Sequence, residues 1–232
     1  MIKESKESYM WKSTDWNVTV EMHKEAQKLA EGFNRFSKTN FPLKFTDVDV
    51  VIITETNTPD STPKLNEYCV VEDYIPGQFN KWCNNYGFIS AEAKSSNSSM
   101  PAFMHWSWCH SNGEKMISDL QGVRSDDPQS YTLTDPAMLS LTNSYGVTDM
   151  GVEGMAMFFL HHECSSFCER LSKPKKSDFL GVIPDRQLSA TMQQLKNLGD
   201  ATTYTHELKF PPGVREGITT VFRRVARGGY VY

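Results

Sequence analysis

The chain has 232 residues, of which 39% are apolar and 12% aromatic, a composition that supports a packed core and excludes a fibrous or wholly disordered protein. No apolar run reaches the ~18 residues that a membrane-spanning helix needs, and the segment Met1–Trp16 is too polar for a secretory signal. Five cysteines at irregular spacing do not form a disulfide framework. These features predict an intracellular protein without a membrane span, with the cytoplasm as its expected location.

The net charge of −4 is unevenly distributed. Residues 1–172 carry 23 acidic and 14 basic side chains, whereas residues 173–232 carry 5 acidic and 10 basic ones. No basic patch interleaved with aromatic residues indicates nucleic-acid binding. An acidic body does not exclude a nucleotide-binding enzyme, because such a site needs a few local cations and Mg²⁺ and not a positive overall charge.

The first elements along the chain predict part of a small α+β lobe. Apolar residues at helical spacing predict an amphipathic helix over Val20–Lys38. Two segments rich in β-branched residues, Val48–Thr54 and Tyr68–Tyr74, predict strands joined by a proline-containing turn. Gly77 closes this lobe, and residues 79–85 are predicted to be helical.

The next elements predict a second, more apolar part of the fold. Residues 90–100 predict a flexible loop, and Pro101 begins a helix at a position where its missing N–H costs nothing. A short strand over Met116–Ser118 precedes a polar loop at residues 124–131. The segment Gly151–Leu160 is apolar enough to be a buried helix.

Beyond residue 172 the apolar pattern weakens. The stretch KPKK, two adjacent prolines and RGG make an ordered second domain unexpected. We therefore expect residues 172–232 to be a basic, largely disordered tail, in which one amphipathic segment, Leu188–Leu198, docks on the body.

Two aspartates lie in motifs that suit a divalent cation. The motif DLQGV begins at Asp119, and LTDP contains Asp135. Carboxylates with a neighbouring glutamine, Gln121, offer the oxygen ligands that Mg²⁺ prefers. The alternative is that both aspartates merely form turns, since aspartate is common after strands and before proline.

Histidine and cysteine side chains predict a second metal site. His162, Cys164 and Cys168 supply three nitrogen and sulfur ligands within seven residues, and His105 on the earlier helix is the candidate fourth. The alternative is a pair of buried cysteines near surface histidines. A third feature is weaker: Gly146, Gly151 and Gly154 surround the start of the apolar helix, where backbone amides can approach a phosphate, but their loose spacing favours a tight turn as the explanation.

Four blocks, taken in order and spacing, resemble the alpha-kinase family of atypical serine/threonine protein kinases. They are VVEDYIPGQFNKWCNNYG at residues 70–87, PAFMHWSW at 101–108, SDLQGV with LTDPAM at 118–138, and YGVTDMGVEGMAMFFLHHECSSFC at 145–168. The resemblance covers roughly residues 1–171. It implies a two-lobed protein-kinase-like α+β fold with ATP in the cleft, a zinc-stapled C-terminal lobe, and phosphorylation of serine or threonine in protein substrates.

The resemblance also implies roles for single residues. The expected ATP-binding residues are Lys3, Glu72, Gly146 and Gly151. The residues expected at the phosphates or the reacting centre are Lys81, Asn85 and the catalytic Asp119. Gln121 and Asp135 match the Mg²⁺ ligands, and the structural Zn²⁺ set is His105, His162, Cys164 and Cys168, with His161 as a neighbour only.

The sequence departs from the family pattern at its start. The strands and the phosphate-covering loop that precede the ATP-binding lysine are missing upstream of Lys3, so the N-terminal lobe is expected to be truncated, with weakened ATP binding and slow transfer. Thr19 stands where a lysine-pairing glutamate is expected, and Glu21 is the nearest acidic residue. The alternative function is a catalytically weak or inactive zinc-binding interaction module. A zinc hydrolase is disfavoured because four protein ligands leave zinc no open position.

Overall fold

The computed structural model describes residues 2–3, 16–55, 64–94, 98–198 and 209–227, with backbone only for 2–3 and 194–198. In chain order the elements are β1 (Ile2–Lys3), α1 (Asn17–Ser37), β2 (Leu43–Phe45), β3 (Val48–Ile52), β4 (Tyr68–Glu72), β5 (Phe79–Lys81), α2 (Met100–His110), β6 (Lys115–Ser118), β7 (Gln121–Asp126), β8 (Gln129–Thr134), β9 (Ala137–Ser140), α3 (Gly151–His161), the short 3₁₀ helix η2 (Ser166–Cys168), α4 (Lys176–Leu180), α5 (Asp185–Leu198) and α6 (Pro212–Ala226). This is the α+β class expected from the sequence.

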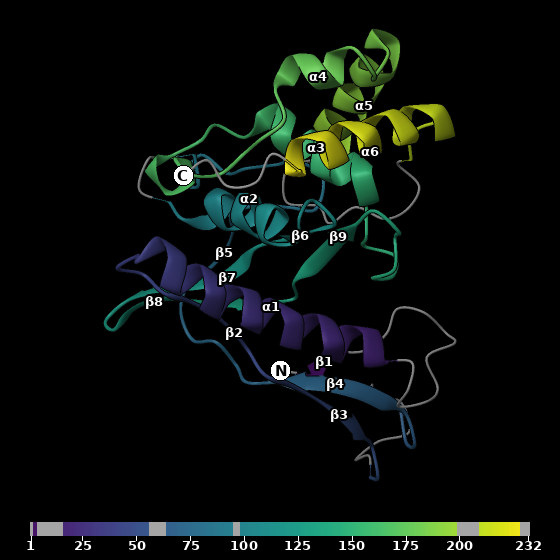
Figure 1. Ribbon diagram of the computed structural model, residues 1–232. Helices are drawn as coiled ribbons and strands as arrows, with labels where there is room; N and C mark the ends of the chain where they lie inside the picture. The colour runs from purple at the N-terminus through teal and green to yellow at the C-terminus, as the bar shows by residue number, and fades with distance from the viewer. Residues whose placement is uncertain (1, 4–15, 56–63, 95–97, 199–208, 228–232) are drawn as a thin grey trace.

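Helix α1 and a small antiparallel sheet form one end of the molecule (Figure 1). The strand order in this sheet is β1-β4-β3. Helix α1 buries Met22, Ala26, Ala30 and Phe33, which recur every three or four residues and therefore share one face. The helix ends where Lys38 adopts a left-handed conformation. The predicted helix and both predicted strands are confirmed, with ends shifted by a few residues.

Two further sheets connect this end to the helical part of the molecule. The larger has the order β2-β8-β7-β5, and β6 pairs with β9 in a separate ladder. Gly122 is required inside β7: its φ is +150°, and an added Cβ would lie 2.1 Å from the carbonyl oxygen of Thr132 on β8. The glycine of the DLQGV motif thus lets two backbones approach closely.

Helices α2 and α3 are buried on all sides, as their nearly continuous apolar sequences indicate. Pro101 lies in the first turn of α2, as predicted. Helix α1 approaches α2 closely at Gly32, where an added Cβ would lie 2.7 Å from the Trp106 ring. In the described part of the chain, no helix combines the length and the apolar character needed to cross a bilayer.

Two predictions of local structure are wrong. Residues 79–85 do not form a helix: Phe79–Lys81 is strand β5, which pairs antiparallel with β7. The polar stretch at residues 124–131 is not a simple loop but the end of the β7–β8 hairpin. In both segments, backbone pairing with a neighbouring strand holds polar and partly exposed residues in strands that lack an alternating apolar pattern.

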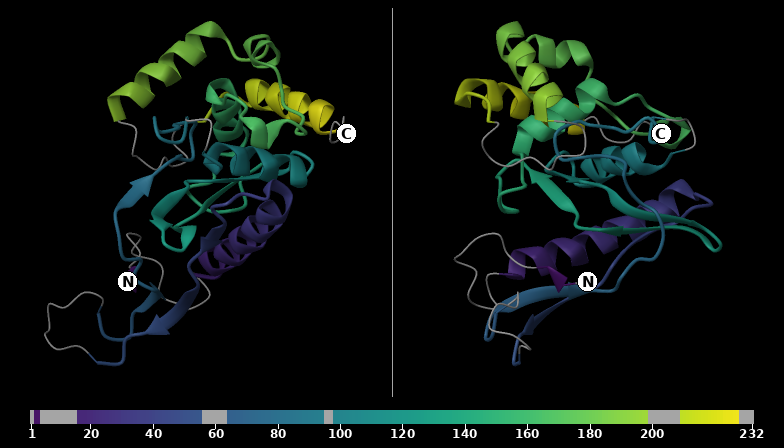
Figure 2. Two further views of the ribbon diagram at one scale, coloured as in Figure 1. Left: turned by 90° about the vertical axis from the view of Figure 1, so that its left-hand side faces the viewer. Right: turned by 180° about the vertical axis from the view of Figure 1, so that it is seen from behind.

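The segment after residue 172 also differs from the expected disordered tail. Its described residues form α4, α5 and α6, which lie on the side of α3 away from α1 (Figures 1 and 2). Phe179 and Phe222 are fully buried, and the Phe222 ring packs against Trp108 and Phe159. The basic, proline-containing composition concealed a short apolar stripe on α6, which is sufficient to extend the core.

Candidate active site and metal centre

The candidate active site lies where two strands pass from one sheet to another. The β6–β9 ladder ends at the pair Ser118 and Ala137. The β7–β8 ladder begins at the pair Gln121 and Thr134. Between these pairs each chain segment makes a two-residue step, and the two steps lie opposite each other.

Asp119 and Asp135 occupy these opposite steps. Both have a left-handed backbone, with φ of 58° for Asp119 and 49° for Asp135. Such a conformation is uncommon outside glycine, although aspartate tolerates it better than most residues. Asp119 is buried and Asp135 is exposed. One of the two aspartates is therefore buried and the other is exposed to solvent, on opposite segments of the same break between the sheets.

Lys81 contacts the buried carboxylate. Its Nζ lies 2.7 Å from Oδ1 of Asp119, and the side chains are only 11% and 4% exposed. Lys81 is the last residue of β5 and pairs with Gln121 on β7. The Gln121 side-chain amide is 3.5 Å from the Asp135 carbonyl oxygen. Strand register thus brings together four residues that the sequence placed at the reacting centre or on Mg²⁺.

Glu72, the last residue of β4, connects this strand to the region of the two aspartates. Its Oε2 accepts hydrogen bonds from the hydroxyls of Thr46 (2.8 Å) and Thr134 (2.5 Å). Thr134 directly precedes Asp135, so the Glu72 side chain ties β4 to the step that carries the exposed carboxylate. Neither threonine was assigned a role from the sequence: Thr46 lies in none of the motifs, and Thr134 lies in LTDP, where only Asp135 was singled out. The expected contact of Glu72 with adenine stays a prediction.

The other residues expected to bind the nucleotide are Lys3, in β1, and Gly146 and Gly151, before and at the start of α3. Lys3 pairs with Val70 through its backbone, and the structure describes only the backbone of this residue. Gly146 is exposed with φ of +81°. The N–H of Gly151 donates to the Asp149 carboxylate at 2.9 Å. ATP binding by these residues stays a prediction.

Asn85 is fully buried, and its side-chain Nδ2 donates to the carbonyl oxygen of Thr148 at 2.9 Å. Thr148 belongs to the loop between β9 and α3, which closes around Asp149. The Asp149 carboxylate, itself fully buried, accepts hydrogen bonds from the backbone N–H groups of Ser140 and Gly151. Asp149 was not singled out in the sequence, because an isolated aspartate before a helix has no distinguishing pattern.

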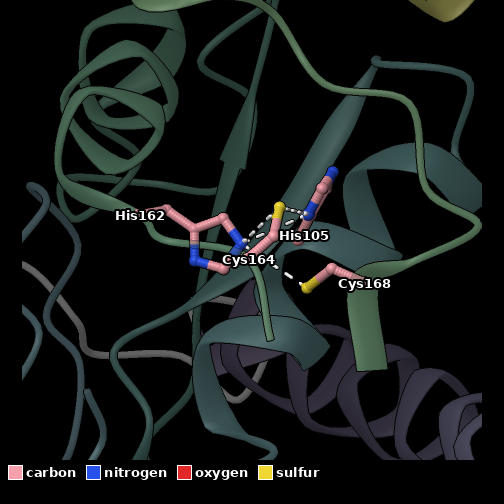
Figure 3. Close-up of side chains that lie close together, drawn as sticks. All are labelled: His105, His162, Cys164 and Cys168. Atoms are coloured by element: carbon pink, nitrogen blue, oxygen red, sulfur yellow. Dashed lines mark hydrogen bonds between the residues drawn. The ribbon is translucent and has the colours of Figure 1, made fainter. Parts of the chain in front are cut away.

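The second site joins α2 to the segment after α3. The ring of His105 on α2 and the side chains of His162, Cys164 and Cys168 point toward one another (Figure 3). One ligand atom from each lies within 4.8 Å of all the others. Individual separations are 3.2 Å between the two ring nitrogens, 3.8 and 3.7 Å from the Cys164 sulfur to them, and 3.5 Å from the Cys168 sulfur to His162.

These separations fit a tetrahedral Zn²⁺. Ligands at ~2.0–2.3 Å from such an ion are roughly 3.3–3.8 Å from one another. His105 Nε2 lies 2.9 Å from the carbonyl oxygen of Ser172, which can only accept, so Nε2 carries the proton and Nδ1 offers its lone pair to the cluster. His161 faces elsewhere: its Nδ1 lies 2.8 Å from the Met157 carbonyl oxygen.

The protonation states of His162 and Cys164 suit a metal, whereas the hydrogen bond to Cys164 and burial raise the pKa of Cys168, so that metal binding has to displace the proton of this thiol. Burial lowers the pKa of His162, which favours the neutral imidazole that binds metals. The hydrogen bond from Cys168 and those from the two histidines lower the pKa of Cys164, which favours a thiolate. Cys109, although nearby, instead donates to the Ser172 carbonyl at 3.2 Å, and burial raises its pKa to about 12. The donor set is therefore two imidazoles and two sulfurs.

Comparison with known proteins identifies relatives of part of the chain. Myosin heavy chain kinase B of Dictyostelium discoideum is 30% identical over 173 residues, which cover 71% of this chain and 21% of that protein. Transient receptor potential cation channel subfamily M member 6 of Mus musculus is 28% identical over 170 residues, covering 69% of this chain and 8% of that protein. The chain spans less than a quarter of the length of these curated relatives.

Solved structures of alpha-kinases are also similar to this chain. The alpha-kinase of Entamoeba histolytica is 28% identical with a TM-score of 0.60, over 72% of this chain and 66% of that one. The alpha-kinase domain of myosin-II heavy chain kinase A, solved in complex with ATP, has a TM-score of 0.58 at 23% identity, over 72% of this chain and 61% of that one, and supports the fold alone. The sequence model of the alpha-kinase family matches residues 1–168, and the chain therefore belongs to the alpha-kinase family.

Proposed function

We propose that this chain is a protein kinase that transfers the γ-phosphoryl group of ATP to serine or threonine side chains of protein substrates. The observation that carries the proposal is the convergence of Lys81, Asp119, Gln121 and Asp135 on one break between two sheets. A scaffold needs no such combination of a buried ion pair, an amide and an exposed carboxylate. Phosphoryl transfer does, because it depends on positioning and on charge neutralisation.

In this proposal Asp119 acts on the substrate hydroxyl. Its carboxylate orients the serine or threonine hydroxyl and accepts its proton as the oxygen attacks the γ-phosphorus, while the bond to the β-phosphate oxygen breaks and ADP leaves. Lys81, which lies 2.7 Å from Asp119, supplies the positive charge nearest to this carboxylate. We assign Asn85 to the same centre as a contact to the phosphates, and Lys3, Glu72, Gly146 and Gly151 to the nucleotide.

Two metal ions complete the proposal. Asp135 and Gln121 offer a carboxylate and an amide oxygen, which would hold Mg²⁺ with the phosphates. Bound Mg²⁺ neutralises part of the phosphate charge. His105, His162, Cys164 and Cys168 would hold Zn²⁺ as a closed structural site that pins the segment after α3 to α2.

The decisive experiment compares two aspartate variants in a radiolabel transfer assay with Mg·ATP and a generic serine- and threonine-containing protein substrate. Asp119→Asn should lower transfer by on the order of 100-fold or more, because a positioned acid–base group contributes about that much. Asp126→Asn is the matched control, since Asp126 ends β7 on the exposed hairpin and pairs only with Arg124 among the described residues. Equal rates of transfer by wild type and Asp119→Asn would overturn the proposal. A wild-type protein that transfers no phosphate at all would overturn it as well.

A further inference from the structure

The loop between β9 and α3, residues 141–150, is held in one conformation by its own polar groups. The carboxylate of Asp149 accepts hydrogen bonds from the N–H groups of Ser140 (2.8 Å), Tyr145 (3.2 Å) and Gly151 (2.9 Å). Because a buried carboxylate with several N–H donors is costly to expose, the loop moves as a unit or not at all.

Asn85 is attached to this unit. Its side-chain amide donates to the Thr148 carbonyl at 2.9 Å. On the other side, the first turn of α3 packs against its backbone: a Cβ added to Gly154 would lie 2.6 Å from the Asn85 carbonyl oxygen. The loop and the start of α3 therefore set the position of a residue assigned above to the reacting centre.

Arg215 on α6 contacts both of these supports. Its Nη2 donates a hydrogen bond to Oδ1 of Asn143, and the Nδ2 of Asn143 in turn donates to the Asp149 carbonyl at 2.8 Å. Its Nε lies 3.0 Å from Oε1 of Glu153 on α3. The guanidinium of Arg215 thus joins the loop to α3, the helix that directly follows it. Arg215 itself is more than sixty residues away from both along the chain.

The ion pair with Glu153 anchors Arg215 firmly. The Glu153 side chain is 0% exposed and that of Arg215 is 26% exposed. The backbone N–H of Phe210 also donates to Glu153 Oε1, at 2.9 Å. Helix α6 is held in turn by its apolar face, where Phe222 packs against Trp108 and Phe159. The contact to Asn143 therefore comes from a rigid support.

We propose that Arg215 is a positioning residue that fixes the loop at residues 141–150, and through it Asn85, so that helix α6, which lies outside the family-matched residues 1–168, is part of the functional kinase unit. This inference rests on the proposed function for its catalytic consequence only. The structural consequence is that Arg215 orders the loop, and this can be measured without any assay of catalysis.

Two variants distinguish a positioning role of Arg215 from a role that depends only on its charge pair with Glu153. Arg215→Lys keeps a positive charge for Glu153, but an ammonium is a point charge and does not provide the planar fork that reaches two acceptors. The double variant Arg215→Gln with Glu153→Gln removes the buried charge and its partner together, so that no carboxylate is left unpaired. Arg224→Gln is the matched control, because Arg224 is on the same helix but pairs with Asp178 on α4 at 2.7 Å.

The experiment measures amide hydrogen exchange and transfer kinetics on the same proteins. In Arg215→Lys and in the double variant, exchange of the amides of residues 141–150 should accelerate by about tenfold or more, while α6 amides keep their protection. The kcat should fall by on the order of tenfold through displacement of Asn85, with little change in KM for ATP. Arg224→Gln should change none of these quantities.

The outcomes distinguish the two proposals. Loop amides that exchange at the wild-type rate in both Arg215 variants would overturn the positioning role, whatever the activity. Faster exchange with unchanged kcat would overturn its catalytic consequence. A wild-type protein that shows no transfer at all refutes the proposed kinase function, whereas hydrogen exchange still decides whether Arg215 orders the loop.

Discussion

The hydroxyl of Thr134 donates a hydrogen bond to the buried carboxylate of Glu72, so the strand that leads to Asp135 is tied to strand β4 of another sheet. On the β8 side this contact is made by the Thr134 hydroxyl. Valine has the same shape without the hydroxyl, so Thr134→Val tests its contribution directly.

We expect Thr134→Val to lower the free energy of unfolding by about 1–3 kcal/mol, because a buried charged acceptor loses a donor. Chemical denaturation measures this difference. Thr132→Val is the control, since Thr132 is on the same strand and only partly buried. Equal loss of stability in both variants would show that β-strand packing, and not the Glu72 contact, is responsible.

A second prediction concerns the ion pair between Lys81 and Asp119. Lys81→Met leaves the Asp119 carboxylate buried without its cation and should destabilise the protein by about 3–5 kcal/mol. Adding Asp119→Asn to that variant should recover most of the loss, because no charge then remains unpaired. A double-mutant cycle from denaturation curves measures the coupling. Strictly additive effects would contradict the contact.

The elements that the sequence predicted well are those with strong local signals. Helix α1 has apolar residues at helical spacing, α2 begins at Pro101, and α3 is a continuous apolar run. Strand β5 and the β7–β8 hairpin were missed because their polar residues are held by backbone pairing, which leaves no periodic signal. Helix α6 was missed because basic residues and prolines surround its short apolar stripe.

The functional residues also differ in whether a local sequence signal marks them. Local spacing picked out His162, Cys164 and Cys168, and the need for a fourth tetrahedral ligand pointed to His105 on the earlier helix; the structure brings these four side chains together. The ion pair between Arg215 and Glu153 has no counterpart in the sequence pattern, because only the packing of α6 on α3 brings these residues together. Tertiary contacts between distant segments do not alter periodicity or composition.

A third prediction concerns pH. Burial raises the pKa of Glu153 above its ordinary value of 4.5, although the Phe210 N–H, its own backbone, Arg215 and Lys209 act in the opposite direction. The folded state therefore holds the proton more tightly than the unfolded state. The resulting stabilisation is complete below pH 4.5 and is lost as the pH rises through the folded-state pKa.

Glu153→Gln removes this titration, so wild type should lose stability relative to the variant as the pH rises above 4.5. Thermal denaturation of both proteins between acidic and neutral pH measures the difference. Glu216→Gln removes a carboxylate from the exposed side of α6 and controls for the change in net charge. A constant difference between wild type and Glu153→Gln across this range, or one of opposite sign, would contradict the prediction.

The last prediction is one zinc ion per chain, bound by His105, His162, Cys164 and Cys168. Two imidazoles and two thiolates at tetrahedral separations match the ligand preferences of Zn²⁺. The site joins α2 to the segment after α3, so zinc binding contributes directly to the folding free energy of this region. Elemental analysis of the purified protein should find zinc at a ratio near one, and a strong chelator should lower the melting temperature.

A pair of cysteine variants tests the assignment of the ligands. Cys168→Ser should release zinc and destabilise the protein, because a hydroxyl replaces a thiolate in a site that has no spare ligand. Cys109→Ser is the matched control, since Cys109 is also buried beside the cluster and contacts the Ser172 carbonyl but supplies no ligand. It should keep one zinc per chain. Zinc retained by Cys168→Ser, or lost equally from both variants, would contradict this ligand set, and a wild-type protein without zinc would refute the site itself.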